Sequence, residues 1–244
     1  MLELPRIIAH RGASGSAPEN TIAAFRAAAA AGAKFVEFDS SLTSDARPVV
    51  FHDDVLDRTT DGTGLLAETP FETLTHLDAG SWFNATFAGE MVPTLDEVLE
   101  TLADLGLGFN MEIKPDRGRE EETARISLAA VADIWPKDAV APLISSFSRT
   151  SVAVAKDVAP DQARSFLFDR RPEDWREIGE SLGLFGFGAN HTHLDERQVA
   201  EIKQAGYRLT AYTVNTLERA SLLFGWGVDA IFTDHPALMI KSFP

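Results

Sequence analysis

Near the amino terminus stands Ile7-Ile8-Ala9-His10-Arg11-Gly12, three apolar residues followed directly by an imidazole, a guanidinium and a glycine. A brief apolar run bounded by a turn signal is typical of a fully buried strand in a parallel sheet. His10 and Arg11 would then lie at the carboxyl end of that strand, where sheets of this kind bind their ligands. Gly12 allows the chain to change direction immediately afterwards. The stretch therefore predicts a parallel sheet with a ligand site beside His10.

Similar strands recur along the chain and alternate with helices. We predict further barrel strands starting at residues 34, 108, 142, 164, 185, 207 and 229, and helices over 17–33, 94–105, 119–135, 149–158, 173–182, 195–205 and 216–225. Ser16 or Asn20 is the expected cap of the first helix. Eight strands that alternate with helices indicate a closed (β/α)8 TIM barrel, with an open doubly wound sheet as the alternative. The length fits a single domain over residues 1–244.

A hairpin is expected directly after the second strand. That strand alternates apolar with acidic side chains, which places Glu37 and Asp39 on one face. The polar link 43–47 is too short for a parallel crossover, so the next strand, 48–52, must return antiparallel. Its return brings His52 roughly level with Asp39, and we therefore expect His52 to join the acidic pair.

The segment 53–93 shows no clean helical or strand period and is rich in turn residues. Some forty residues without a period are too many for an ordinary loop. We predict that this segment forms a small inserted subdomain after the second strand and covers the end of the sheet.

Composition narrows the classes of partner. The formal net charge of -15 argues against nucleic acid and anionic membranes, because the long-range field would repel both. The chain has no cysteine, which excludes disulfides. It has neither an apolar run of membrane-spanning length nor a basic leader followed by an apolar stretch. We expect a cytoplasmic protein without stable membrane anchoring that acts on a small molecule, attracted by local charge.

Three carboxylates are expected over the mouth of the barrel. Glu37 and Asp39 lie on one face of the second strand, and Glu112 occupies the neighbouring strand. Two such charges about 4 Å apart repel by roughly 4 kcal/mol at an effective dielectric constant near 20. A cation resolves this repulsion, and an all-oxygen ligand set favours one divalent ion, Mg²⁺ or Ca²⁺. The alternative is protonation of one carboxylate, or pairing with Arg11 and Lys114.

Arg11 and Lys114 are cations placed beside these acids. A phosphate would pair with both cations, since a guanidinium donates two parallel hydrogen bonds to two phosphate oxygens and an ammonium acts as a point charge. Ordinary salt bridges to Glu112 or Asp39 are the alternative.

His10 and His52 are suited to proton transfer near neutral pH. Phe147, Trp82 and Tyr212 are candidates for the wall of the pocket, although aromatic residues at such positions are core packing at least as often.

Together these segments resemble the glycerophosphodiester phosphodiesterase family. The resemblance spans almost the whole chain in order, and no single stretch would suffice. Many members carry tryptophan where this chain has Tyr212, and an apolar residue and a glycine where it has Ser40 and Ala46. The matching stretches are His10-Arg11-Gly12, Pro18-Glu19-Asn20-Thr21, Val36-Glu37-Phe38-Asp39, Val50-Phe51-His52-Asp53, Asp57-Arg58-Thr59-Thr60, Ala79-Gly80-Ser81-Trp82, Pro93-Thr94-Leu95, Met111-Glu112-Ile113-Lys114, Ser145-Ser146-Phe147, Thr213-Val214-Asn215 and Thr233-Asp234-His235-Pro236.

The resemblance implies a barrel with a small insertion after its second strand, as the strand pattern also predicts. It implies metal-dependent hydrolysis of glycerophosphodiesters, such as glycerophosphocholine or glycerophosphoethanolamine, to sn-glycerol 3-phosphate and an alcohol, within lipid and glycerol metabolism. Carried over by position, the family pattern makes His10 and His52 acid and base, without saying which is which. The implied metal ligands are Glu37, Asp39 and Glu112; the implied substrate-binding residues are Arg11 and Lys114, with Phe147 and Tyr212 as candidates for the pocket wall.

Three alternatives remain at this point. A lysophospholipase D-like enzyme would use the same machinery on lysophospholipids and would need an apolar groove. A catalytically idle binding barrel would not need both histidines and all three acids. A barrel isomerase acting on a phosphorylated sugar would not need the acidic triad.

Overall fold

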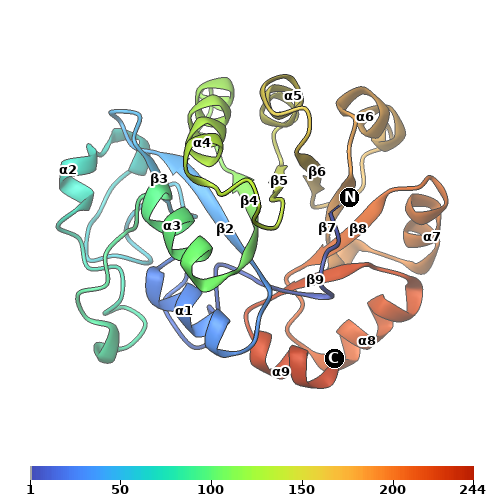
Figure 1. Cartoon of the computed structure of the whole chain (residues 1–244), viewed down its shortest axis with the longest axis horizontal. Coiled ribbons are helices and arrows are strands. Elements are labelled where there is room, and N and C mark those ends of the chain that lie inside the picture. Colours follow the sequence, from blue (N-terminus) through green and yellow to red (C-terminus); the bar gives the residue numbers. More distant parts are fainter. Residues whose placement is uncertain (1) are drawn as a thin grey trace.

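A closed barrel of parallel strands forms the centre of the molecule (Figure 1). The computed structural model describes residues 2–244. Within this range β1 pairs with both β2 and β9, which closes the sheet on itself and confirms the predicted (β/α)8 barrel. The barrel strands are β1 (Ile7–Ala9), β2 (Phe35–Leu42), β4 (Gly108–Ile113), β5 (Leu143–Ser146), β6 (Ala163–Phe168), β7 (Gly186–Asn190), β8 (Arg208–Tyr212) and β9 (Ala230–Thr233).

Helices surround the barrel (Figure 1) and bury one apolar face each against the strands. None of those in residues 2–244 is long and apolar enough to cross a lipid bilayer. The last helix was not predicted from the sequence. The helices are α1 (Ile22–Ala30), α3 (Leu95–Leu105), α4 (Glu120–Ile134), α5 (Arg149–Val158), α6 (Trp175–Leu182), α7 (Glu196–Gln204), α8 (Leu217–Trp226) and α9 (Pro236–Ser242).

The first helix is shorter than predicted. It begins after Thr21, whose hydroxyl accepts a hydrogen bond from the Ala24 backbone N–H at 3.3 Å, so Thr21 is the cap rather than Ser16 or Asn20. Asn20 instead adopts a left-handed conformation, with φ of 58°, that an asparagine tolerates better than most residues. The residues before the cap therefore form a loop over the carboxyl end of β1.

The predicted hairpin is present. Strand β3 (Pro48–Val50) pairs antiparallel with β2, with Ser40 opposite Val50. The Phe51 N–H then donates to the Asp39 carbonyl at 3.0 Å. This places His52 beside the acidic face of β2, as the link length predicted.

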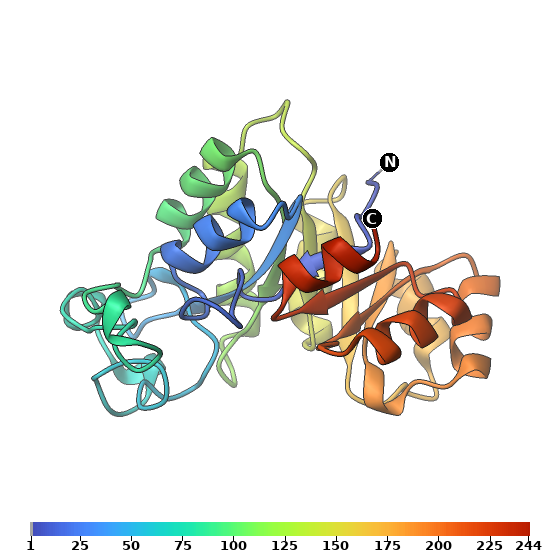
Figure 2. The ribbon, with the colours of Figure 1, turned by 90° about the horizontal axis from the view of Figure 1, so that it is seen from below.

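The segment between β3 and α3 lies at one side of the barrel, away from both termini (Figures 1 and 2). It contains two short 3-10 turns and one short helix: η1 (Leu66–Glu68), α2 (Phe71–Leu74) and η2 (Ala85–Phe87). Leu56, Leu66 and Leu74 are buried in an apolar cluster of its own that also includes Val49 of β3. This cluster attaches the segment to the barrel next to the hairpin.

Candidate active site

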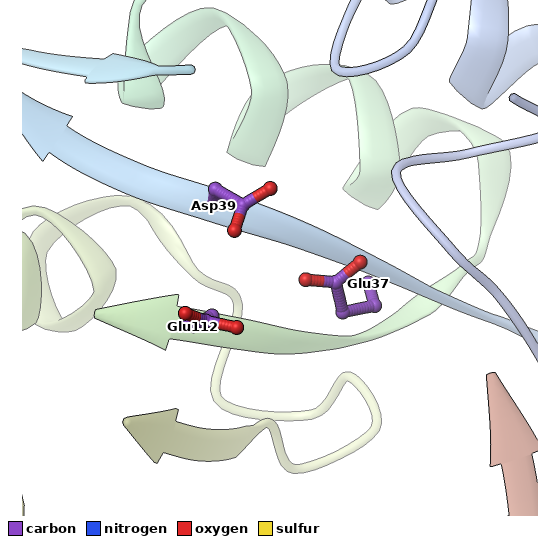
Figure 3. A group of neighbouring side chains, drawn as sticks. All are labelled: Glu37, Asp39 and Glu112. Atoms are coloured by element: carbon purple, nitrogen blue, oxygen red, sulfur yellow. The ribbon is translucent and has the colours of Figure 1, made fainter. Parts of the chain in front are cut away.

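Three carboxylates lie together on two neighbouring strands (Figure 3), two of them buried and the third, Glu112, partly exposed. Glu37 and Asp39 project from β2, and Glu112 on β4 is the direct register partner of Asp39. One oxygen from each group lies within 4.8 Å of the others. In the part of the chain that the structure describes, they form the single group with metal-ligand spacing. The structure thus brings together the three acids that the strand spacing placed side by side.

The three carboxylates do not ionise equally. Burial raises the pKa of Glu112 to about 8, and the nearby Asp39 charge adds to the effect. Burial and the Asp39 charge also raise the pKa of Glu37 well above its usual value. Burial would raise the pKa of Asp39 as well, but the neighbouring charges, Arg11 first, and the Asn20 hydrogen bond together outweigh burial, and the pKa of Asp39 lies below its usual value. Asp39 is therefore the first of the three to ionise.

A divalent cation fits this donor set. All of the candidate ligand atoms are carboxylate oxygens, the donors that Mg²⁺ and Ca²⁺ prefer. The high pKa values of Glu37 and Glu112 indicate that the site lacks enough positive charge of its own to keep three carboxylates ionised. A bound cation would supply that charge.

His10 lies next to Glu37 at the end of β1. Its Nε2 lies 4.0 Å from a Glu37 oxygen, and its Nδ1 donates to Asp234 at 2.7 Å. Asp234 also accepts hydrogen bonds from Ser14 at 2.8 Å and Asn215 at 2.6 Å. The Asp234 carboxylate, held by these contacts, orients the imidazole so that Nε2 faces the acidic cluster.

His52 has a different pair of partners. Its Nδ1 donates to Asp53 at 2.5 Å, and the Lys114 ammonium lies 3.3 Å from its Nε2. Burial lowers the pKa of His52, and Arg11 and Lys114 lower it further against the opposing charge of Asp39. These contacts favour a neutral His52 whose Nε2 accepts a hydrogen bond from the Lys114 ammonium.

Arg11 forms the ion pairs that the sequence left as an alternative. Its Nε lies 3.3 Å from Asp39, its Nη1 donates to Glu19 at 2.7 Å, and its backbone N–H donates to Glu37 at 2.9 Å. Its φ of 52° is left-handed, which is unusual for an arginine and turns the backbone N–H toward the acids. Lys114 approaches His52 and forms no ion pair of 4.0 Å or less within residues 2–244.

A cavity of about 530 Å³, including its open mouth, lies over these groups. This is a suitable size for a small-molecule site. Every predicted site residue except Asp39 lines it: His10, Arg11, Glu37, His52, Glu112, Lys114, Phe147 and Tyr212. Asp39 lies behind the wall, where the Asn20 amide donates to it at 2.9 Å. Trp82, a further candidate, is not part of the wall and donates to the Ala79 carbonyl within the segment between β3 and α3.

Phe147 and Tyr212 form one apolar wall of the cavity. Their rings meet edge to face, with centroids 5.8 Å apart. The Tyr212 hydroxyl donates to the Phe168 carbonyl at 2.9 Å, which leaves the flank of the ring toward the cavity. Burial raises the pKa of Tyr212, so the hydroxyl remains a donor at neutral pH.

Several site residues were missed in the sequence. Asn110 lines the cavity, and Glu19, Asn20, Asp53 and Asp234 hold the predicted residues in place. Glu19, Asn20, Asp53 and Asp234 belong to stretches that carry the family resemblance, which was the available signal. Each of these residues acts by contacting another side chain, and the sequence does not show which side chain that is.

A parallel (β/α)8 barrel with carboxylates, imidazoles and cations gathered at the carboxyl ends of its strands is the architecture of a barrel enzyme. Comparison with known proteins narrows this class. The chain belongs to the glycerophosphoryl diester phosphodiesterase family, whose model matches residues 10–238. Membership makes it a phosphoric diester hydrolase and confirms the resemblance seen in the sequence.

Individual relatives cover nearly the whole chain. It is 37% identical to YhdW of Bacillus subtilis, over 97% of each chain. It is 35% identical to the glycerophosphodiester phosphodiesterase of Caldanaerobacter subterraneus, over 96% of each chain. Among solved structures it resembles an Oleispira antarctica phosphodiesterase in complex with the product sn-glycerol-3-phosphate, at 42% identity and a TM-score of 0.96, over 98% of this chain and 96% of the other.

Proposed function

We propose that the enzyme hydrolyses glycerophosphodiesters to sn-glycerol 3-phosphate and an alcohol, with one divalent cation, Mg²⁺ or Ca²⁺, held by Glu37, Asp39 and Glu112. The observation that carries the proposal is the set of groups around one cavity: three carboxylates, two histidines and two cations. The product bound to the Oleispira relative supports the choice of substrate.

Arg11 and Lys114 are the residues that would hold the phosphate. Both line the cavity, and Lys114 contacts no carboxylate at ion-pair distance in residues 2–244, so its charge is available to a substrate. Arg11 can offer a fork of N–H donors to two phosphoryl oxygens. The phosphodiester would therefore bind between these two cations and the carboxylates.

His10 and His52 would transfer the protons. Each is held through Nδ1 by its own aspartate, at 2.7 Å and 2.5 Å, which leaves Nε2 to meet the substrate. One imidazole would remove a proton from the nucleophile and the other would protonate the departing alkoxide, each contributing about 10² to 10⁴-fold. A divalent cation in the acidic cluster would polarise the phosphoryl oxygens and offset developing negative charge.

Phe147 and Tyr212 would pack against the glycerol carbons. Their edge-to-face pair provides an apolar surface on the wall of a cavity whose other lining groups include charged residues. A three-carbon alcohol can place its CH₂ groups on such a surface while its hydroxyls face the polar side.

The test is release of glycerol 3-phosphate from glycerophosphocholine by the wild type, His10→Ala and Glu37→Gln, each with and without EDTA. We expect both variants to lose at least about 10²-fold in kcat/KM, and EDTA to abolish wild-type activity until Mg²⁺ or Ca²⁺ is restored. The control is His76→Ala, which alters an exposed histidine just after the end of α2. Full activity in EDTA would refute the need for a cation. Full activity of His10→Ala or Glu37→Gln would refute the role proposed for that residue.

A further inference from the structure

Arg58 lies outside the cavity wall, in the segment between β3 and α3, yet its guanidinium is fully engaged with two carboxylates. Nε and Nη2 donate to Asp53 at 2.5 and 2.9 Å. Nη1 and Nη2 donate to Glu19 at 2.8 and 2.7 Å. Two bidentate pairs on one arginine fix both carboxylates relative to each other.

Each of these carboxylates has a second partner in the active site. Asp53 accepts from Nδ1 of His52 at 2.5 Å. Glu19 accepts from Nη1 of Arg11 at 2.7 Å. The contacts therefore run without a break from His52 through Asp53, Arg58 and Glu19 to Arg11.

The signs of the charges alternate from Asp53 through Arg58 and Glu19 to Arg11. The hydrogen bonds of Arg58 are the largest cause of the pKa of Asp53 lying far below its usual value. The pKa of Glu19 is also below its usual value, because Arg58 and Arg11 together outweigh the effect of burial. Both carboxylates are thus ionised and hold their cationic or imidazole partners at neutral pH.

The backbone that carries Arg58 is itself well anchored. Leu56, two residues before it, is 1% exposed in the apolar cluster of the segment. Thr60, two residues after it, donates its hydroxyl to the Leu56 carbonyl at 2.8 Å. This loop therefore presents the guanidinium from a fixed position, although the side chain itself remains 44% exposed.

We propose that Arg58 is a positioning residue that holds His52 and Arg11 in one fixed arrangement, acting through Asp53 and Glu19. The inference rests on the proposed function of His52 in proton transfer and of Arg11 in phosphate binding. It gives the segment between β3 and α3 a role in the reaction, because this segment supplies the arginine that connects His52 to Arg11.

The experiment measures kcat and KM for glycerophosphocholine in the wild type, Arg58→Ala, Arg58→Lys, Asp53→Asn, Glu19→Gln and the double variant Arg58→Ala/Asp53→Asn. Arg208→Ala is the matched control, since Arg208 is similarly exposed at 50% and pairs with Asp229 at the amino end of β8. Thermal unfolding of every variant is recorded. If the unfolding midpoint of Arg58→Ala is substantially lowered, the kinetics of Arg58→Lys test the inference instead.

We expect Arg58→Ala to lower kcat by about 10- to 100-fold and to raise KM, as loss of an orienting partner does elsewhere. Asp53→Asn should lower mainly kcat, and Glu19→Gln should raise mainly KM. Arg58→Lys keeps the charge but loses the paired N–H donors, and its kcat should fall between those of the wild type and Arg58→Ala, more than about twofold below the wild type. The double variant should be no more than about twofold worse than the poorer single variant, because both changes break the same series of contacts.

Arg58→Ala or Arg58→Lys with kcat and KM within twofold of the wild type would overturn the inference. So would losses that multiply in the double variant, since they would mean that Arg58 and Asp53 act separately. A wild type that does not hydrolyse glycerophosphocholine would instead refute the proposed function, so the two failures are distinguishable in one assay.

Discussion

Glu112 is a partly exposed carboxyl group of the cavity wall, and its ionisation depends on its surroundings. Its pKa of about 8 results first from burial and then from the charge of Asp39. A buried carboxyl group that must ionise at working pH destabilises the folded protein. The acidic cluster therefore lowers the stability of the folded protein, as is common at functional sites.

The destabilisation caused by ionising Glu112 predicts that Glu112→Gln changes the stability of the protein in EDTA in a pH-dependent way. The folded pKa is raised from 4.5 to about 8, so the protonated form favours folding below about pH 4.5, and that contribution is lost as the pH rises through 8. The glutamine stays neutral throughout. We therefore expect the free energy of unfolding of Glu112→Gln, measured in urea, to exceed that of the wild type by up to about 4 kcal/mol at pH 9. At pH 5 the two proteins should differ little.

Glu121→Gln, which alters an exposed carboxylate on α4, is the control and should show no such dependence on pH. Saturating Mg²⁺ or Ca²⁺ should reverse the order at pH 9, because a cation that binds only the folded wild type stabilises it. Equal stability of wild type and Glu112→Gln at pH 9 in EDTA would contradict the assigned pKa.

At the scale of elements, the hairpin of β2 and β3 decides where His52 lies. The turn closes with the Thr43 N–H donating to the Arg47 carbonyl at 3.1 Å. Ala46 within it has a φ of 60°, in the left-handed region that favours glycine. The hairpin therefore contains local strain at Ala46.

Ala46→Gly should relieve this strain. We expect the free energy of unfolding to rise by about 0.5 to 1 kcal/mol, the left-handed penalty for alanine less the entropy that a glycine loses on folding. Ala129→Gly, at an exposed position inside α4, is the control and should lower it by about 1 kcal/mol. Urea unfolding measures both, and a destabilised Ala46→Gly would show that the turn is not strained.

At the scale of the whole molecule, the net charge of -15 opposes the approach of an anionic substrate. The cations proposed to hold the phosphate, Arg11 and Lys114, line the cavity. Long-range repulsion is screened by salt, whereas contacts within the cavity are screened much less.

This difference predicts that two substrates of different net charge respond differently to salt. Glycerophosphoglycerol carries a net negative charge, and its kcat/KM should rise by about two- to fivefold as NaCl is increased from 10 to 200 mM. Zwitterionic glycerophosphocholine is the matched control and should change by less than about twofold. A fall in kcat/KM for the anionic substrate alone would show that local attraction, rather than net charge, governs its approach.

Much of the architecture followed from the sequence because it is local. Apolar runs and helical periods predicted all eight barrel strands, and the short link after β2 predicted the hairpin that returns His52. The boundaries were less exact: α1 begins at Ile22, because Thr21 caps it and the preceding residues bend over the site. The carboxylates were found because spacing along a strand and the order of neighbouring strands suffice to place them together.

The sequence by itself determined the barrel, the family and the set of acids, histidines and cations at the carboxyl ends of the strands. Only the tertiary structure decided which groups hold them. Asp234 meets His10 across 224 positions of the chain because β9 closes against β1, and Arg58 joins Asp53 to Glu19 because its loop brings the guanidinium between them. Periodicity reports backbone conformation and burial, whereas contacts between loop side chains depend on the closure of the whole chain, which no local pattern encodes.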